Sequence, residues 1–176
     1  NERFVLAEHA SNGWVYDFDI QQWTAERSPG FYRILGYTPD EATADVKWWH
    51  SLFHPDDRNL LTAPAVNARG DQEFSEVEYR IRHRDGHYVH VLDRSRQICD
   101  AAGKRVRMVG ITVDISERKR AELHQHFLSE LGLQLRLLSD TEAMTAHLVH
   151  SLGHHLQVAG CRVNEINLPD TQFSIQ

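Results

Sequence analysis

The spacing of apolar residues changes near Ser116, and this change constrains the fold more than any other feature of the sequence. Before it, apolar and charged residues alternate with a period of two, most clearly where Val77, Tyr79 and Ile81 stand between charged neighbours. After it, apolar residues recur every three or four positions, at Leu123, Phe127, Leu131, Leu135 and Leu138. A period of two is typical of a β-strand and a period near four of a helix. The sequence therefore predicts a sheet domain followed by a helix.

Three long strands are predicted before the change, over residues 73–83, 87–99 and 105–114. Asp85-Gly86 between the first two is a strong hairpin signal. The last of the three strands is apolar on both faces, which is typical of a strand covered on both sides. We expect one of its faces to line the domain interior and the other to meet a helix or a partner subunit.

The N-terminal part predicts shorter elements: a helix over residues 3–10, a strand over 14–19 and a second short strand around 23–25. Short helices should then begin at three capping signals, namely Ser28-Pro29, the Thr38 to Glu41 box, and His54-Pro55-Asp56-Asp57. The third helix should run to about residue 68. Beyond the long helix, a Ser139 to Glu142 box predicts another helix to about residue 156, followed by strands over 161–168 and 172–176.

Composition excludes several classes of protein. The chain has 176 residues and a net charge of −6, so a nucleic-acid surface is not expected. No apolar run approaches the length of a membrane helix. Cys99 and Cys161 fall in different predicted domains, which argues against a disulfide framework and fits a reducing, cytoplasmic location. Because the chain begins Asn1-Glu2-Arg3, we expect a piece of a longer polypeptide.

Four local stretches carry a family resemblance: residues 28–41, His54 to Arg58, Glu78-Tyr79-Arg80 with Arg84-Asp85-Gly86, and Gly110 to Lys119. Together they resemble the PAS domain of bacterial sensors with its C-terminal PAC motif, over about residues 3–120. The resemblance implies an α+β fold, a five-stranded antiparallel sheet with flanking short helices. Residues 128–176 resemble the first helices and strands of a GAF domain. The predicted domains are a PAS domain over 1–115, a linker helix over 116–138 and an incomplete GAF-like part over 139–176.

PAS domains can hold a small ligand between the sheet and the helices, so the resemblance implies a pocket lined by aromatic and aliphatic side chains. The candidates are Tyr16, Phe31, Trp49, Phe53, Leu61, Tyr79 and Ile111. Most of the aromatic residues are also explained as core packing. The Asn-Cys-Arg-Phe motif of cysteinyl-flavin domains is absent, and residues 58–68 lack the histidine of haem domains. His54 is interpreted as a helix cap, and the cofactor is left undetermined.

No catalytic constellation is present, since the sequence lacks a nucleophile elbow, a phosphate-binding loop and a kinase ATP signature. The chain is therefore interpreted as a non-catalytic regulatory fragment. No metal site is predicted, although His147, His150 and His154 recur at helical spacing and leave metal binding as the lesser alternative.

The favoured hypothesis is a signal-input and dimerisation module of a larger histidine kinase or cyclic-nucleotide enzyme, which acts on a downstream output domain. A small-molecule ligand is a candidate partner, and no membrane contact is expected. The relay should pass through Asp114, Ile115 and Ser116, where the last strand meets the helix. The alternative is a ligand-free domain for dimerisation or protein interaction. The apolar last strand and the helical stripe together predict a homodimer.

Overall fold

The computed structural model describes residues 8, 10–61, 74–156 and 158. The chain divides into two compact units between Lys119 and Arg120, inside the helix α4 (Ser116–Leu137). Each unit is described by itself below. The expected boundaries at residues 115 and 138, and the GAF-like assignment, stay predictions.

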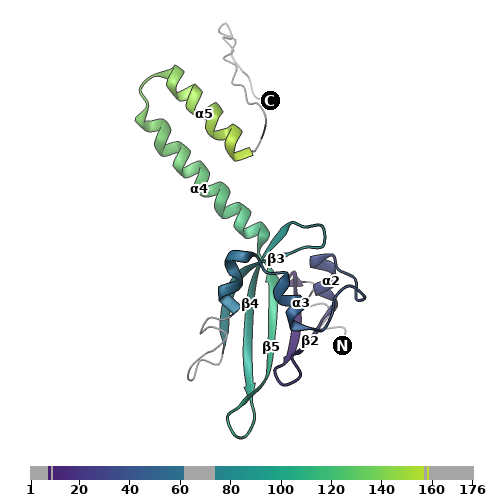
Figure 1. Cartoon of the computed structure of the whole chain (residues 1–176). Coiled ribbons are helices and arrows are strands. Elements are labelled where there is room, and N and C mark those ends of the chain that lie inside the picture. Colours follow the sequence, from purple (N-terminus) through teal and green to yellow (C-terminus); the bar gives the residue numbers. More distant parts are fainter. Residues whose placement is uncertain (1–7, 9, 62–73, 157, 159–176) are drawn as a thin grey trace, which may run out of the picture. The chain divides into compact units, whose positions relative to one another are not determined.

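The first unit is built on a five-stranded antiparallel sheet in the order β2-β1-β5-β4-β3 (Figure 1). Its strands are β1 (Gly13–Asp19), β2 (Thr24–Arg27), β3 (Ser75–Arg82), β4 (Tyr88–Cys99) and β5 (Arg105–Asp114). The first strand pairs with the last, so that Trp14 lies opposite Thr112. This places β5 in the centre of the sheet, with Thr112 fully buried on its inner face.

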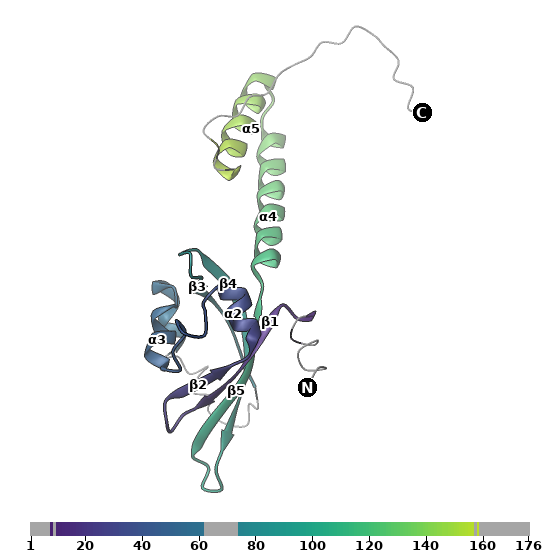
Figure 2. The same ribbon diagram turned by 90° about the vertical axis from the view of Figure 1, so that its right-hand side faces the viewer.

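Two short α-helices and a 3-10 helix pack on one face of this sheet: α2 (Pro29–Leu35), α3 (Val46–Ser51) and η1 (Pro55–Leu61) (Figure 2). The core forms between these helices and the sheet. Trp14, Phe31, Leu35 and Ile81 are fully buried there. Burial of such large side chains supplies the main stabilisation of the unit.

The helix signal at Ser28-Pro29 was right, and the one at Thr38 was wrong. The helix predicted at Ser28-Pro29 is α2, and Gly36 ends it at a φ of 74°, which glycine adopts without strain. The box from Thr38 to Glu41 starts no helix: the Thr38 amide donates to Glu41 Oε2 at 2.9 Å and closes a single turn. The next helix, α3, is capped by Asp45 instead.

The helix predicted to start after His54 is present, as the 3-10 helix η1. Its first turn is held from outside, because Asp57 Oδ2 accepts a hydrogen bond from the Arg80 amide of β3 at 2.8 Å. Such tertiary ties favour the short, tight helix. The His54 cap is present, with Nδ1 accepting from the Asp56 amide at 3.3 Å. The continuation predicted to residue 68 lies outside the described residues.

The second unit holds most of α4 and the helix α5 (Thr141–Leu156). Within it, the Phe127 ring stacks on the His155 ring at 3.8 Å, and Leu131 is buried. Phe127 of the predicted apolar stripe therefore contacts α5 of the same chain, whereas Leu123 stays 63% exposed. None of the helices that the structure describes is both long and apolar enough to cross a membrane. The strands predicted over 161–168 and 172–176, the helix over 3–10 apart from Glu8 and Ala10, and Cys161 lie outside the described residues.

Candidate functional site

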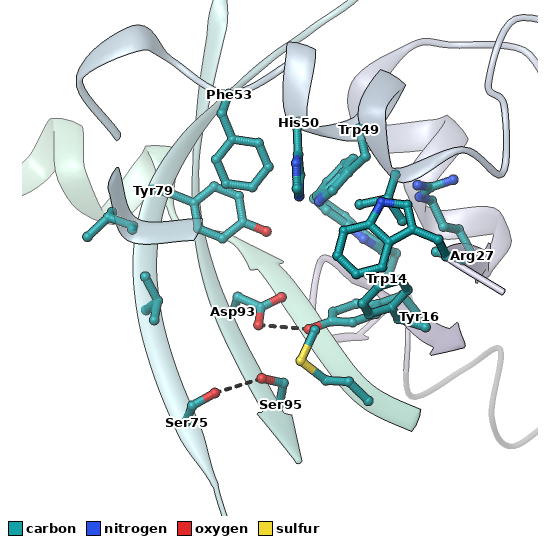
Figure 3. A pocket seen from close by; sticks show the side chains of 17 residues that line it. Trp14, Tyr16, Arg27, Trp49, His50, Phe53, Ser75, Tyr79, Asp93 and Ser95 are labelled. Carbon is teal, nitrogen blue, oxygen red and sulfur yellow. Dashed lines mark hydrogen bonds between the residues drawn. The ribbon is translucent and has the colours of Figure 1, made fainter. Parts of the chain in front are cut away.

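A cavity of about 160 Å³ lies in the first unit, between the sheet and the segment that contains α3 and η1 (Figure 3). Its walls are mainly aromatic. Trp14 and Trp49 meet edge to face with ring centres 6.4 Å apart, and Phe53 stacks on Tyr79 at 4.4 Å. Aromatic pairs of this kind form rigid, flat walls. An apolar cavity with a few polar groups is the usual form of a small-molecule site.

The structure brings together four of the seven predicted pocket residues: Tyr16, Trp49, Phe53 and Tyr79 line the cavity. Phe31 does not line it; the ring is fully buried behind the wall, 5.7 Å from Trp14 and 5.9 Å from Trp49.

Ile111 does not line the cavity either, so its inclusion among the candidates was wrong. It alternates on β5 with Met108 and Thr112, whose side chains lie on the cavity side of the sheet. Ile111 therefore faces the opposite side of the sheet. The backbone of Leu61 ends η1, and its side chain lies outside the described part of the structure.

Asp93 on β4 is the main polar group of the cavity, and the sequence analysis missed it. Its Oδ1 accepts a hydrogen bond from the Tyr16 hydroxyl at 3.0 Å, and its Oδ2 accepts one from the Thr112 hydroxyl at 2.7 Å. Burial raises the pKa of Asp93 to about 6, although both hydrogen bonds act in the opposite direction. Near neutral pH this carboxyl can therefore gain or lose a proton.

A glycine allows Tyr16 to reach Asp93. Tyr16 pairs with Gly110 across β1 and β5. A Cβ at Gly110 would stand 2.6 Å from the Tyr16 ring and hydroxyl, a distance that no side chain tolerates. Only glycine at this position leaves the ring room to lie over the strand. Gly110 was part of the family resemblance in the sequence, but only the fold shows that the Tyr16 ring packs over it.

Arg27 at the end of β2 also lines the cavity. Its guanidinium carbon lies 5.2 Å from the ring centres of Phe31 and Trp49, and its Nη1 donates to the Thr43 carbonyl at 3.0 Å. Burial lowers the pKa of Arg27, and interactions with Tyr32 and Tyr79 oppose this only in part. The positive charge therefore rests on aromatic faces and a carbonyl.

Two serine side chains on β3 and β4 complete the set of polar groups in the cavity. Ser75 and Ser95 share a hydrogen bond of 2.7 Å across the two strands (Figure 3). Both line the cavity beside Asp93. Their hydroxyls can turn to donate or accept, so they can adapt to a bound group.

The predicted relay residues meet at the start of α4. Asp114 Oδ1 accepts from the Ser116 amide at 2.8 Å, so it caps the helix. The Ser116 hydroxyl accepts from the His90 amide at 3.0 Å, and the Ile115 amide donates to the His90 carbonyl at 2.8 Å. Ile115 is buried. These contacts tie the first turn of α4 to β4.

Glu78 on β3 adds a second tie that the sequence analysis did not identify. Its carboxylate accepts hydrogen bonds from Arg118 at 2.6 Å and pairs with Lys119 at 2.7 Å. Hydrogen bonds from Lys119 and then Arg118 lower the pKa of Glu78. Two basic residues in the first turns of α4 therefore bind the sheet.

One side-chain cluster could hold a divalent cation, although no metal site was predicted. On the β3–β4 hairpin, Asp85 Oδ1 lies 3.0 Å from His83 Nδ1 and 2.5 Å from His87 Nδ1. The His87 amide and then the two imidazoles lower the pKa of Asp85 to about 2. The three side chains thus satisfy one another's hydrogen-bonding groups within the hairpin. Among the described residues, His147, His150 and His154 form no such group.

Comparison with known proteins bears on the same region. The sequence profile of the PAS fold matches residues 24–112. A sensory box histidine kinase/response regulator from Burkholderia thailandensis has a solved structure that is 31% identical, with a TM-score of 0.63 over 77% of this chain and 99% of that one. The N-terminal domain of a diguanylate cyclase with PAS/PAC sensor from Marinobacter aquaeolei is 26% identical, with a TM-score of 0.54 over 61% of this chain and 98% of that one.

Curated relatives are longer proteins. A blue-light-activated histidine kinase from Brucella anthropi is 30% identical over 66% of this chain, which spans 23% of that protein. A methyl sulfide methyltransferase-associated sensor from Methanosarcina acetivorans is 29% identical over 67% of this chain, which spans 11% of it. The chain therefore corresponds to a small part of these relatives.

Proposed function

The chain belongs to the PAS family, and we propose that it is the signal-input module of a larger signal-transduction protein. Its cavity receives a small molecule, and the helix α4 passes the change toward an output domain. Relatives named as histidine kinases and a diguanylate cyclase support this role. The fragment itself acts without catalysis.

The hydrogen bond between Thr112 and Asp93 carries the proposal. Asp93 faces the cavity, and Thr112 lies on β5, two residues before Asp114. A ligand that binds or displaces the Asp93 carboxylate changes the acceptor of the Thr112 hydroxyl. Because Thr112 is fully buried, this change must be taken up by a small movement of β5.

The movement reaches α4 through its capping contacts. Asp114 and Ser116 cap the first turn and His90 binds Ser116 and Ile115, so a shift of β5 against β4 alters these bonds together. Such a junction can have two discrete arrangements. The ligand favours one of them by binding it more tightly.

Hydrogen exchange tests the relay without any ligand. Thr112→Val keeps the shape of the side chain but removes the hydroxyl that binds Asp93, whereas Thr112→Ser keeps the hydroxyl. We expect faster amide exchange at Ile115 and Ser116 in the valine variant than in the serine variant, with unchanged exchange at the β3–β4 pairs. Equal protection of the junction in both variants would remove the support for this relay.

We also propose that the module is a homodimer, with a second copy on the outer face of the sheet. Val15, Val109, Ile111 and Val113 leave apolar surface partly exposed on that face, whereas α2, α3 and η1 pack on the other. Sedimentation should give twice the chain mass of 20.3 kDa. Ile111→Asp should give monomers, and a wild-type mass of one chain at all concentrations would contradict the dimer.

A further inference from the structure

Arg27 is a half-buried cation for which the described residues supply no counter-ion. Its Nη1 donates to the Thr43 carbonyl at 3.0 Å, but its Nη2 is buried and has no hydrogen-bond partner. No carboxylate in the described part of the chain forms an ion pair with it. A buried charge without a partner is costly, and proteins normally pair it. Arg27 lines the cavity, so a small rotation of its guanidinium brings this unused donor to a bound group.

The aromatic rings around Arg27 leave this donor free. Phe31, Trp48 and Trp49 lie within 5.2 to 5.7 Å of the guanidinium carbon. A ring attracts the guanidinium mainly through its face, whereas the N–H groups of arginine point outward in its plane. An acceptor must therefore come from another direction. A carboxylate suits it best, because its planar oxygens match the geometry and charge of a guanidinium.

The size and walls of the cavity select the body of the ligand. A volume of about 160 Å³ is close to that of cavities that take up a single benzene molecule. Trp14, Trp49 and Phe53 present flat aromatic surfaces to this space. Such walls favour a single aromatic ring, which can stack or pack edge to face against them.

Asp93 supplies a second polar contact at a distance from Arg27. Arg27 is on β2 and Asp93 on β4, and β1 and β5 lie between them in the sheet. Three strand spacings separate their backbones by about 14 Å. Burial is the main cause of the raised pKa of Tyr79; the charge of Asp93 raises it further and that of Arg27 lowers it, so Tyr79 lies within the influence of both groups. A ligand with an acceptor at one end and a donor at the other fits between them.

We infer that the cavity binds a small monocyclic aromatic carboxylate. Its carboxylate accepts from Nη2 of Arg27, its ring packs against Trp14 and Trp49, and a donor such as a para hydroxyl reaches Asp93. This inference rests on the proposed function, because it names the ligand class of the same cavity.

Calorimetry with matched ligands tests the inference on the whole chain. Benzoate and benzamide have the same shape but differ in charge, so benzoate should bind at least about tenfold more tightly, the ratio that one lost charge-assisted hydrogen bond produces. In the same way, 4-hydroxybenzoate should bind more tightly than 4-methylbenzoate. Quenching of tryptophan fluorescence gives a second readout, because Trp14 and Trp49 line the cavity.

Arg27→Met keeps an apolar chain of similar length and should abolish the preference for benzoate while leaving benzamide binding intact. Arg33→Met is the matched control, because Arg33 is exposed on α2 and does not line the cavity. Equal binding of benzoate and benzamide, or no binding of any benzoate up to its solubility limit, would overturn the inference. Neither result affects the exchange test of the relay, which uses no ligand.

Discussion

Replacing Asp93 by asparagine should change how the stability of the first unit depends on pH. The folded pKa of Asp93 is about 6, above the ordinary 3.8, so the folded state holds this proton more tightly than the unfolded state does. The stabilisation is complete below the unfolded pKa and is lost as pH rises through the folded pKa. Asparagine stays neutral throughout and lacks this loss.

The shift of about two pKa units corresponds to about 3 kcal/mol, of which about 2 kcal/mol falls between about pH 4.5 and 7.5. The unfolding free energy of Asp93→Asn should therefore rise by this amount relative to the wild type across that interval. The hydrogen bonds can persist, because the Tyr16 and Thr112 hydroxyls can each donate to or accept from an amide.

Urea unfolding followed by tryptophan fluorescence measures this difference, since Trp14, Trp23, Trp48 and Trp49 all belong to the first unit. Comparing the two proteins at each pH cancels the contributions of the other carboxyl groups to the pH dependence. Asp40→Asn, which removes an exposed carboxyl group, is the control. A difference between Asp93→Asn and the wild type that stays constant from pH 4.5 to 7.5 would show that Asp93 ionises without a penalty.

Three further substitutions test other parts of the structure. Asp57→Asn should lower the unfolding free energy by about 2 kcal/mol in urea, because Asp57 binds the amide and guanidinium of Arg80; since these bonds lower the pKa of Asp57, the wild type should lose that advantage as pH falls below about 4. Gly110→Ala should cost about 1–3 kcal/mol and weaken ligand binding, because the new Cβ collides with Tyr16; unchanged binding by calorimetry would contradict its role. Gly132→Ala, in α4 with open space around it, should raise helix stability by about 0.5–1 kcal/mol, and no rise in melting temperature by circular dichroism would contradict this.

The regular elements could be predicted from the sequence because each has a local cause. Alternation placed the three long strands to within two residues of β3, β4 and β5, since side chains on a strand must alternate between two faces. The start of α4 at Ser116 followed from the change of period. Where the same local signal serves two structures, prediction failed: the Thr38 to Glu41 box closes either a helix or a single turn.

Most residues of the cavity could be identified only from the tertiary structure, but one of them was predictable from the sequence. Asp93 and Ser95 follow the buried Val89 and Val91 at every second position along β4 and so lie on the same face. A carboxyl group on the inner face was therefore detectable from the sequence. The aromatic residues gave no comparable signal. Phe31 and Trp49 both lie on short helices, and only the packing of α2 and α3 decides that Trp49 lines the cavity and Phe31 does not.

Ile111 was misplaced because the central strand is apolar on both faces, and only its pairing with β1 and β4 decides which face is inner. The unpaired Nη2 of Arg27 likewise exists only in the folded chain. Periodicity determines which side of an element is covered, whereas the space left between covered sides depends on how distant segments pack.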